Sequence, residues 1–268
     1  MANTVYPNKV IEAKAKDILT TQINARSMMT IDTSLTQNAG MVKTINTYTY
    51  TGTAEEVAAG SGNSTRGSIA YVGKDYTVKM VQQAFDYLDE DFMKDPVIVD
   101  FGIKGATSVM TNKMTSDFYS ALATKNGATE LGTGITFAKG KALSYDVIVD
   151  AISELNLEDE SKIFIVIPNA WKASLRKDAD YKSAQMGEVI YNGQVGTICG
   201  IPVIATKALT DKAYVMTNEA VTLFLKKDVE VEQDRDADTR KNSVYLRDCY
   251  VCALTDATKA CKITEDAS

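Results

Sequence analysis

The longest regular pattern of apolar and polar positions in the chain runs from residue 95 to residue 127. Its apolar side chains recur at spacings of three and four residues, which places them on one face of a helix. The positions on this face are Val99, Ile103, Ala106, Met110, Met114, either Asp117 or Phe118, and Ala121. The pattern predicts one helix over residues 96–126. At about 1.5 Å per residue this helix would be about 45 Å long, more than the core of a compact domain of this size requires.

Both ends of this helix carry their own signals. Asp95 can cap the first free amides, Pro96 fits the first helical turn, and the pair Asn126-Gly127 is typical of a helix end. Gly102 and Gly105 each weaken the first half of the helix by about 1 kcal/mol relative to alanine. We therefore expect a bend or a close packing contact at these glycines.

Two segments of alternating polarity precede the helix and predict a long two-stranded ribbon over residues 41–80. Apolar and polar positions alternate in both arms, with Val42, Tyr48 and Tyr50 in the first and Val72, Tyr76, Val78 and Met80 in the second. Residues 51–67 between the arms are rich in glycine and small polar side chains, so they form a tip too long for a tight turn. Because an isolated hairpin is marginally stable, the ribbon needs a surface to lie on, and a neighbouring subunit would serve.

The remaining segments predict an arm and a mixed α/β unit. Residues 6–27 are loosely amphipathic and indicate an N-terminal arm containing a helix, packed either on its own domain or on another subunit. Further along, Ser144 can cap a helix, and a second helix is expected from Pro168 through Arg176. Strands are expected at residues 163–167, 201–205 and 213–216, with loops at residues 128–142 and 178–197.

The C-terminal part returns to strands. Residues 221–225, 229–233 and 243–254 each have a strand pattern, and residues 234–242 form an exposed connection of mixed charge.

Composition narrows the functional classes. With 45 % hydrophobic and 24 % charged residues, the chain of 268 residues buries a substantial core. A net charge of −6 without a long basic run disfavours tight binding to duplex nucleic acid. No apolar run approaches the about 20 residues that cross a bilayer, and the first residues lack a secretory pattern, so we expect no membrane association and synthesis in a cytoplasm.

The sequence contains few candidate residues for catalysis or metal binding. The chain has no histidine, which excludes Ser-His and Cys-His nucleophilic pairs. Cys249 and Cys252 have the spacing of a zinc or redox pair, but on a strand this spacing puts the sulfurs on opposite faces, so core thiols are the favoured interpretation over a metal site. Four acidic residues precede the long helix: Asp86, Asp89, Glu90 and Asp91. We expect their negative charge to stabilise the N-terminus of that helix, with binding of a divalent cation as a minor alternative. We expect no catalytic residue, no cofactor and no bound metal.

The order of arm, ribbon, long helix, α/β unit and returning strands resembles the major capsid proteins of tailed bacteriophages with the Hong Kong 97 fold. Three stretches carry the resemblance over nearly the whole chain. The first comprises DTSL at 32–35, GMV at 40–42 and YTYTGTAEEV at 48–57. The second is GQVGTICGIPVI at 193–204, and the third comprises VEVE at 229–232, Arg235, Asp236, Arg240 and YLRDCY at 245–250.

This resemblance implies an α+β fold with a defined division. Residues 1–40 would be the N-terminal arm and residues 41–82 the extended β-hairpin loop. Residues 83–141 and 218–268 would form the peripheral subdomain, with the spine helix at 96–126. The axial subdomain would comprise residues 142–217.

The resemblance also implies a function. Copies would assemble into pentamers and hexamers and then an icosahedral head shell around double-stranded DNA, which is held without sequence-specific binding. Its partners would be a portal and head-completion proteins, and assembly would use either a separate scaffolding protein or no scaffold. The protein would be made in the host bacterial cytoplasm and reside in the virion. Candidate contacts between subunits are Glu55, Glu56, Arg66, Lys74, Arg235, Asp236 and Arg240.

Two other functions stay open on the sequence. A bacterial nanocompartment shell of the encapsulin type would share the fold and enclose a protein cargo. A monomeric α/β enzyme would use the carboxylates at residues 86–91 or the Cys249/Cys252 pair.

Overall fold

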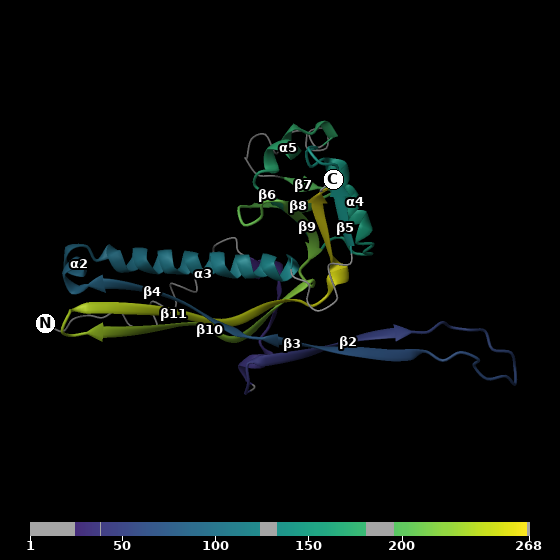
Figure 1. The fold of residues 1–268 in the computed structure, drawn as a ribbon, viewed down its shortest axis with the longest axis horizontal. Helices are drawn as coiled ribbons and strands as arrows, with labels where there is room; N and C mark the ends of the chain where they lie inside the picture. The colour runs from purple at the N-terminus through teal and green to yellow at the C-terminus, as the bar shows by residue number, and fades with distance from the viewer. Residues whose placement is uncertain (1–24, 38, 124–132, 181–195, 267–268) are drawn as a thin grey trace.

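The structure, a computed structural model, describes residues 25–37, 39–123, 133–180 and 196–266. Figure 1 shows three parts: a helix lying along a long sheet, a second sheet with short helices beyond one end of that helix, and a two-stranded ribbon that projects away from both. The predicted helix within residues 6–27 lies almost wholly outside the described residues. What the structure describes there begins with the 3-10 helix η1 (Ala25–Met28), whose Ala25 and Met28 are buried.

The long sheet has four strands in the order β1-β10-β11-β4. Its strands are β1 (Thr30–Asp32), β10 (Val221–Asp236), β11 (Lys241–Leu254) and β4 (Lys79–Leu88), and β11 runs antiparallel to both β10 and β4. The sequence predicted two strands where β10 is one, because two register shifts between Leu225 and Glu230 interrupt the alternation without ending the pairing.

The helix α3 (Val97–Ala123) covers one face of this sheet and follows the short helix α2 (Asp89–Lys94). Its predicted start is confirmed, because the Val97 amide donates to Asp95 Oδ1 at 3.0 Å. The predicted stripe is buried from Val99 to Phe118, but Leu122 takes the last place instead of Ala121. Beyond Met114 the helix packs against residues of the second sheet, which shifts its buried side. The predicted stop at Asn126-Gly127 lies outside the described residues.

The two helix glycines differ in their surroundings. A Cβ atom on Gly102 would lie within 3.0 Å of three atoms of the Phe85 ring, whereas a Cβ on Gly105 would meet no atom of the described residues within 4 Å. The expected close contact is therefore confirmed at Gly102.

The second sheet has six strands in the order β5-β12-β9-β6-β8-β7. Their bounds are β5 (Thr133–Phe137), β12 (Ala260–Glu265), β9 (Lys212–Thr217), β6 (Ile163–Pro168), β8 (Ile201–Thr206) and β7 (Thr197–Ile198). The helices α4 (Tyr145–Glu154) and α5 (Lys172–Lys177) accompany it, and Ser144 caps α4 as predicted. The helix expected from Pro168 begins only at Lys172, because Pro168 still pairs with Thr206 in the sheet.

Two of these strands depart from the expected division of the chain. The sequence placed residues 133–137 in a loop and both 133–137 and 260–265 in the peripheral subdomain, but β5 and β12 pair with each other and β12 pairs with β9 in the six-stranded sheet. Their apolar side chains enter its core, where Cys261 and Ile263 are 0 % exposed. The remaining division stays a proposal.

Candidate intersubunit surfaces

The ribbon consists of β2 (Val42–Thr51) and β3 (Ser68–Thr77), paired antiparallel from Val42 opposite Thr77 to Thr51 opposite Ser68. This confirms a two-stranded ribbon, with one correction at its second arm. Met80 belongs to β4 of the long sheet, because the Val78 amide donates to the Met41 carbonyl at 2.8 Å and Val78 is buried at the ribbon base.

One face of the ribbon is attached to its own chain at the base. Tyr76 is buried there, stacks on Phe224 with ring centroids 5.9 Å apart, and donates its hydroxyl to the Leu254 carbonyl at 3.2 Å. Lys74 lies further out on this same face, where it is half-buried and pairs across the ribbon with Ile45.

The opposite face of the ribbon is aromatic and exposed. We call its four side chains the aromatic face: Tyr48 (66 % exposed), Tyr50 (67 %), Ile69 (69 %) and Tyr71 (70 %). They occupy two adjacent cross-strand pairs, and the rings of Tyr48 and Tyr71 are 6.3 Å apart. The Tyr50 ring lies over two glycines, since Cβ atoms on Gly52 and Gly67 would lie within 2.9 Å of its phenol group. The residues that the structure describes thus shape this face but leave it exposed.

The ribbon tip contains three of the predicted contact residues. Glu55 accepts hydrogen bonds from the Ser64 hydroxyl at 2.5 Å, from the Ser64 amide and from the Thr65 amide at 3.3 Å. These bonds, led by the Ser64 hydroxyl, lower the pKa of the Glu55 carboxyl. Glu55 therefore closes the tip on its own chain, whereas Glu56 and Arg66 are exposed on the tip.

The predicted contact residues in and beside the β10–β11 turn also bond within their own chain. Arg235 pairs with Asp89 at 2.8 Å and Arg240 pairs with Glu90 at 2.8 Å. Asp236 orders the turn itself by accepting from the Asp238 amide at 3.0 Å. The acidic group thus faces bases far away in the sequence as well as the start of α2, a pairing that the sequence did not indicate. Contacts of these residues between subunits remain a prediction.

Asp89 is the centre of the contacts between α2 and the β10–β11 turn. It is buried, and besides Arg235 it accepts from Asn242 Nδ2 at 2.6 Å. Lys241 pairs with Asp86 at 2.7 Å at the same end of the sheet. These bonds tie α2 and the end of β4 to the turn between β10 and β11.

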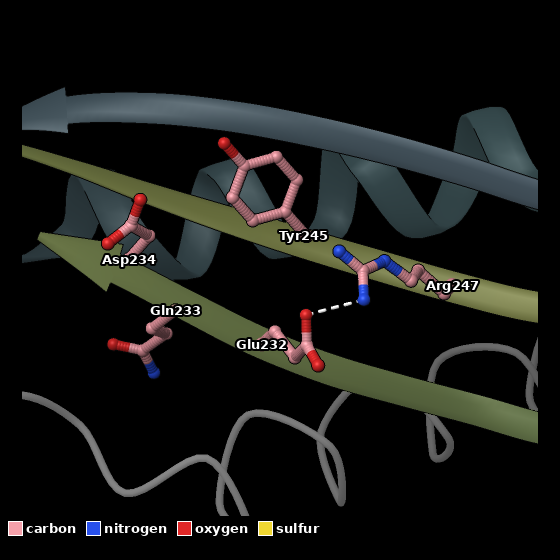
Figure 2. Close-up of a pocket in the computed structure, with 5 residues that line it drawn as sticks. All are labelled: Glu232, Gln233, Asp234, Tyr245 and Arg247. Atoms are coloured by element: carbon pink, nitrogen blue, oxygen red, sulfur yellow. Dashed lines mark ion pairs between the residues drawn. The ribbon is translucent and has the colours of Figure 1, made fainter.

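A shallow hollow of about 680 Å³ lies on the face of the long sheet that points away from α3. Figure 2 shows its lining residues: Glu232, Gln233, Asp234, Tyr245 and Arg247. Arg247 bonds to Glu232 at 2.5 Å and to Gln82 at 2.7 Å, and its guanidinium lies 5.7 Å from the centre of the Tyr245 ring. The charge of Arg247 is thus paired with Glu232, and its guanidinium lies against the Tyr245 ring. Such contacts are typical of the surface of a sheet rather than of a catalytic cleft.

Cys249 and Cys252 behave as core thiols, whereas Cys199 is exposed. Cys249 packs beside Tyr76 and Phe224, whereas Cys252 contacts the separate cluster that includes Met114, in agreement with the expected opposite orientation. Burial raises the pKa of the Cys249 thiol and raises that of Cys252 to about 12, so both stay protonated at neutral pH. Across the described residues, no three histidine, cysteine, aspartate or glutamate side chains come together as metal ligands, and no helix has the length and apolar character to span a bilayer.

Known proteins resemble this chain over most of its length. No protein-family model matches it. The major capsid protein of Staphylococcus phage phiMR11 is 25 % identical over 272 residues, covering 98 % of this chain and 94 % of that protein. Among solved structures, the capsid of cyanophage P-SCSP1u has a TM-score of 0.69 at 12 % identity, covering 90 % of this chain and 87 % of that one. A chain of Mycobacterium phage Che8 has a TM-score of 0.63 at 17 % identity, covering 90 % and 91 %.

Proposed function

We propose that this chain, which has the α+β Hong Kong 97 fold of tailed-bacteriophage capsid proteins, is a major capsid protein that builds an icosahedral head shell from pentamers and hexamers. It is a structural protein. The relative from phage phiMR11 supports this function because the similarity extends over the entire chain instead of a single module.

The observation that carries the proposal is the amount of surface that the chain leaves exposed. Its accessible surface is 15975 Å², whereas a compact monomer of 29.1 kDa exposes about 11,400 Å². The difference, about 4,500 Å², falls within the range of obligate interfaces between subunits, which bury about 2,000–5,000 Å² or more. The projecting ribbon with its aromatic face contributes to this surface. An exposed surface of this size supports packing of the chain against copies of itself.

The enclosed cargo in this proposal is double-stranded DNA, held without sequence-specific contacts. The net charge of −6 supports it, because a wall of this charge does not neutralise many phosphates. A portal, head-completion proteins and a scaffolding protein would join the shell, which would assemble in the bacterial cytoplasm and end in the virion. Glu56, Arg66 and Lys74 would contribute polar contacts around the ribbon.

Sedimentation velocity at rising protein concentration, followed by negative-stain imaging, tests the proposal. We expect capsomer rings or closed particles from the wild-type chain, formed alone or with the scaffolding protein from the same phage. Deleting residues 54–65 shortens only the ribbon tip, so the chain should keep its circular dichroism spectrum and urea midpoint yet form no closed particles. A single 29.1 kDa species under all these conditions, or normal particles from the deletion, would contradict the proposal.

A further inference from the structure

A buried carboxyl interrupts the apolar face that β11 turns toward α3. Leu246 and Tyr250, two residues to either side of Asp248, are both buried on this face. Leu246 packs in the cluster beneath the first half of α3, and Tyr250 packs in the cluster that includes Met114. Asp248 is 2 % exposed, and within the described residues its Oδ1 atom has no hydrogen-bond partner. A carboxyl in this position is costly to bury, so it calls for a reason.

The fold places a second carboxyl and a base beside Asp248. The register between β10 and β11 shifts opposite Asp248, between Lys227 and Glu230, and the resulting β-bulge carries Asp228. Arg26 of η1 reaches the same bulge, with its Nη1 atom 3.4 Å from Asp228 Oδ1. Burial and the Asp228 charge raise the pKa of Asp248 to about 7, whereas the Arg26 charge acts in the opposite direction. Asp248, Asp228 and Arg26 thus form one electrostatic cluster built from three elements.

The other elements packed around this cluster contribute apolar groups, neutral groups and an acid that is already paired. β4 places Val81 directly across from Asp248. α3 contributes Asp117, which is paired with Lys113 at 2.6 Å and accepts from the Tyr250 hydroxyl at 3.1 Å. On β11 itself, burial raises the pKa of the nearby titratable groups, which are Cys249, Tyr250 and Cys252. Among the described residues, the base whose charge acts on Asp248 is therefore Arg26 of η1.

Of the helices that adjoin the cluster, η1 is the one most easily displaced. It is four residues long and buries Ala25 and Met28, whereas α3 buries ten side chains over 27 residues. The part of a fold with the fewest buried contacts opens at the lowest cost in free energy. We therefore expect a local opening that lets water reach Asp248 to displace η1 and leave α3 in place.

We infer that Asp248 is a pH-operated switch that releases η1 from the long sheet when its carboxyl ionises. Since η1 stands between residues 1–24 and β1, the switch acts where the N-terminal part of the chain joins the fold. The inference goes beyond the proposed shell function. It concerns a single chain and is tested without assembly, so its failure leaves the shell function standing.

The direction of the switch follows from the proton affinity of the two states. While η1 is docked, Asp248 is kept from water and holds its proton up to about pH 7. Once η1 is displaced, water solvates the carboxylate and its pKa returns toward 3.8. The docked state therefore binds the proton more tightly, so docking is strongest below about pH 4 and weakens as the pH rises to about 7. Release also removes the Arg26 charge, which opposes this effect, but burial is the larger cause of the raised pKa.

Hydrogen exchange followed by mass spectrometry on the unassembled chain, between pH 5 and pH 8, tests the switch. Exchange rates of the η1 amides are divided by the intrinsic amide rates at each pH. If release restores the ordinary pKa in full, opening of η1 increases about 80-fold over this range. Amides of α3 between Met110 and Phe118 should open far less often than η1 at every pH. Equal opening at both places would mean that the chain unfolds as a whole and would overturn the inference.

Two variants and a control assign the response to Asp248. Asp248→Asn removes the titrating group, so opening of η1 should no longer depend on pH. Arg26→Gln removes the charge that lowers the pKa of Asp248, so the midpoint of the response should move to higher pH, a readout that remains decisive if the Asn variant does not fold. The matched control, Asp146→Asn, replaces an exposed carboxyl of α4 and should keep the wild-type response. Opening that is independent of pH in the wild type, an unchanged response in Asp248→Asn, or an unmoved midpoint in Arg26→Gln would each overturn the inference.

Discussion

Replacing each of the two α3 glycines by alanine should have unequal effects on the stability of the unassembled chain. Alanine is favoured over glycine inside a helix by about 0.8–1.0 kcal/mol. At Gly105 the new methyl group meets no atom within 4 Å among the residues that the structure describes, so Gly105→Ala should raise the free energy of unfolding by about 1 kcal/mol. At Gly102 the same gain is opposed by the Phe85 ring, which lies within 3.0 Å of the new methyl group.

The magnitude at Gly102 follows from the packing around Phe85. This ring packs against the cluster of Val99, Ile103 and Val244 between α3 and the sheet, so it cannot move away without disturbing buried neighbours. Overpacking of a core costs about 1–3 kcal/mol. The helix-propensity gain is common to both variants and cancels in their difference. Gly102→Ala should therefore be less stable than Gly105→Ala by about 1–3 kcal/mol, which is the cost of overpacking alone.

Urea denaturation at a concentration below assembly measures both variants, and a shared m-value allows their midpoints to be compared directly. Phe85→Leu provides the control, because it removes the ring that creates the clash: in that background Gly102→Ala should lose most of its penalty, which a double-mutant cycle quantifies. The reasoning would be refuted if Gly102→Ala were as stable as Gly105→Ala, or if the penalty survived the removal of the ring.

Three further substitutions test other parts of the fold. Burial, with a contribution from Asp228, raises the pKa of Asp248 from its ordinary 3.8 to about 7, so the folded chain holds this proton more tightly than the unfolded chain. The stability that this proton contributes is fully present below about pH 4 and is lost as the pH rises to about 7. Asp248→Asn should therefore reduce the dependence of the free energy of unfolding on pH, measured by urea denaturation across this range. An unchanged pH dependence would contradict the prediction. Asp89→Ala should lower the free energy of unfolding by about 1–3 kcal/mol in the same assay, because Asn242 and Arg235 lose their hydrogen-bond acceptor. A variant as stable as the wild type would show that these bonds do not hold α2 on the sheet. Ser144→Ala should cost only about 0.5 kcal/mol, the lower end for a helix cap, because its bond to the Val147 amide is 3.5 Å long; a loss above 2 kcal/mol would contradict this.

The elements that the sequence predicted well are those whose pattern is local and long. The stripe along α3 repeats over 27 residues, and both ribbon strands alternate over ten residues each, so individual exceptions such as Ala121 do not obscure the period. End signals at Asp95 and Ser144 are equally local, because a cap bonds to amides within three residues of itself.

The features that the sequence did not reveal depend on partners far along the chain. The strand β5 contains threonine and glycine and becomes a strand by pairing with β12, whose Cys261 lies opposite Thr133. The acidic group was assigned to the helix N-terminus, yet Asp89 bonds to Arg235, 146 residues away. No periodicity or motif encodes such pairings, because burial within the assembled sheets selects them.

The fold gives the two helix glycines different surroundings. They are three residues apart, both weaken the helix, and the sequence pattern alone predicts the same bend or close contact for both. The fold separates them: Gly102 admits a side chain from the same chain, and Gly105 faces outward. The contacts around Asp89 tie α2, the short helix that precedes α3, to the end of the long sheet. The described residues hold the ribbon at its base, where Tyr76 stacks on Phe224 and donates to the Leu254 carbonyl. A two-stranded ribbon is marginally stable without a surface to lie on, so its outer part depends on such a surface far more than α3 does, whose stripe is buried on the long sheet.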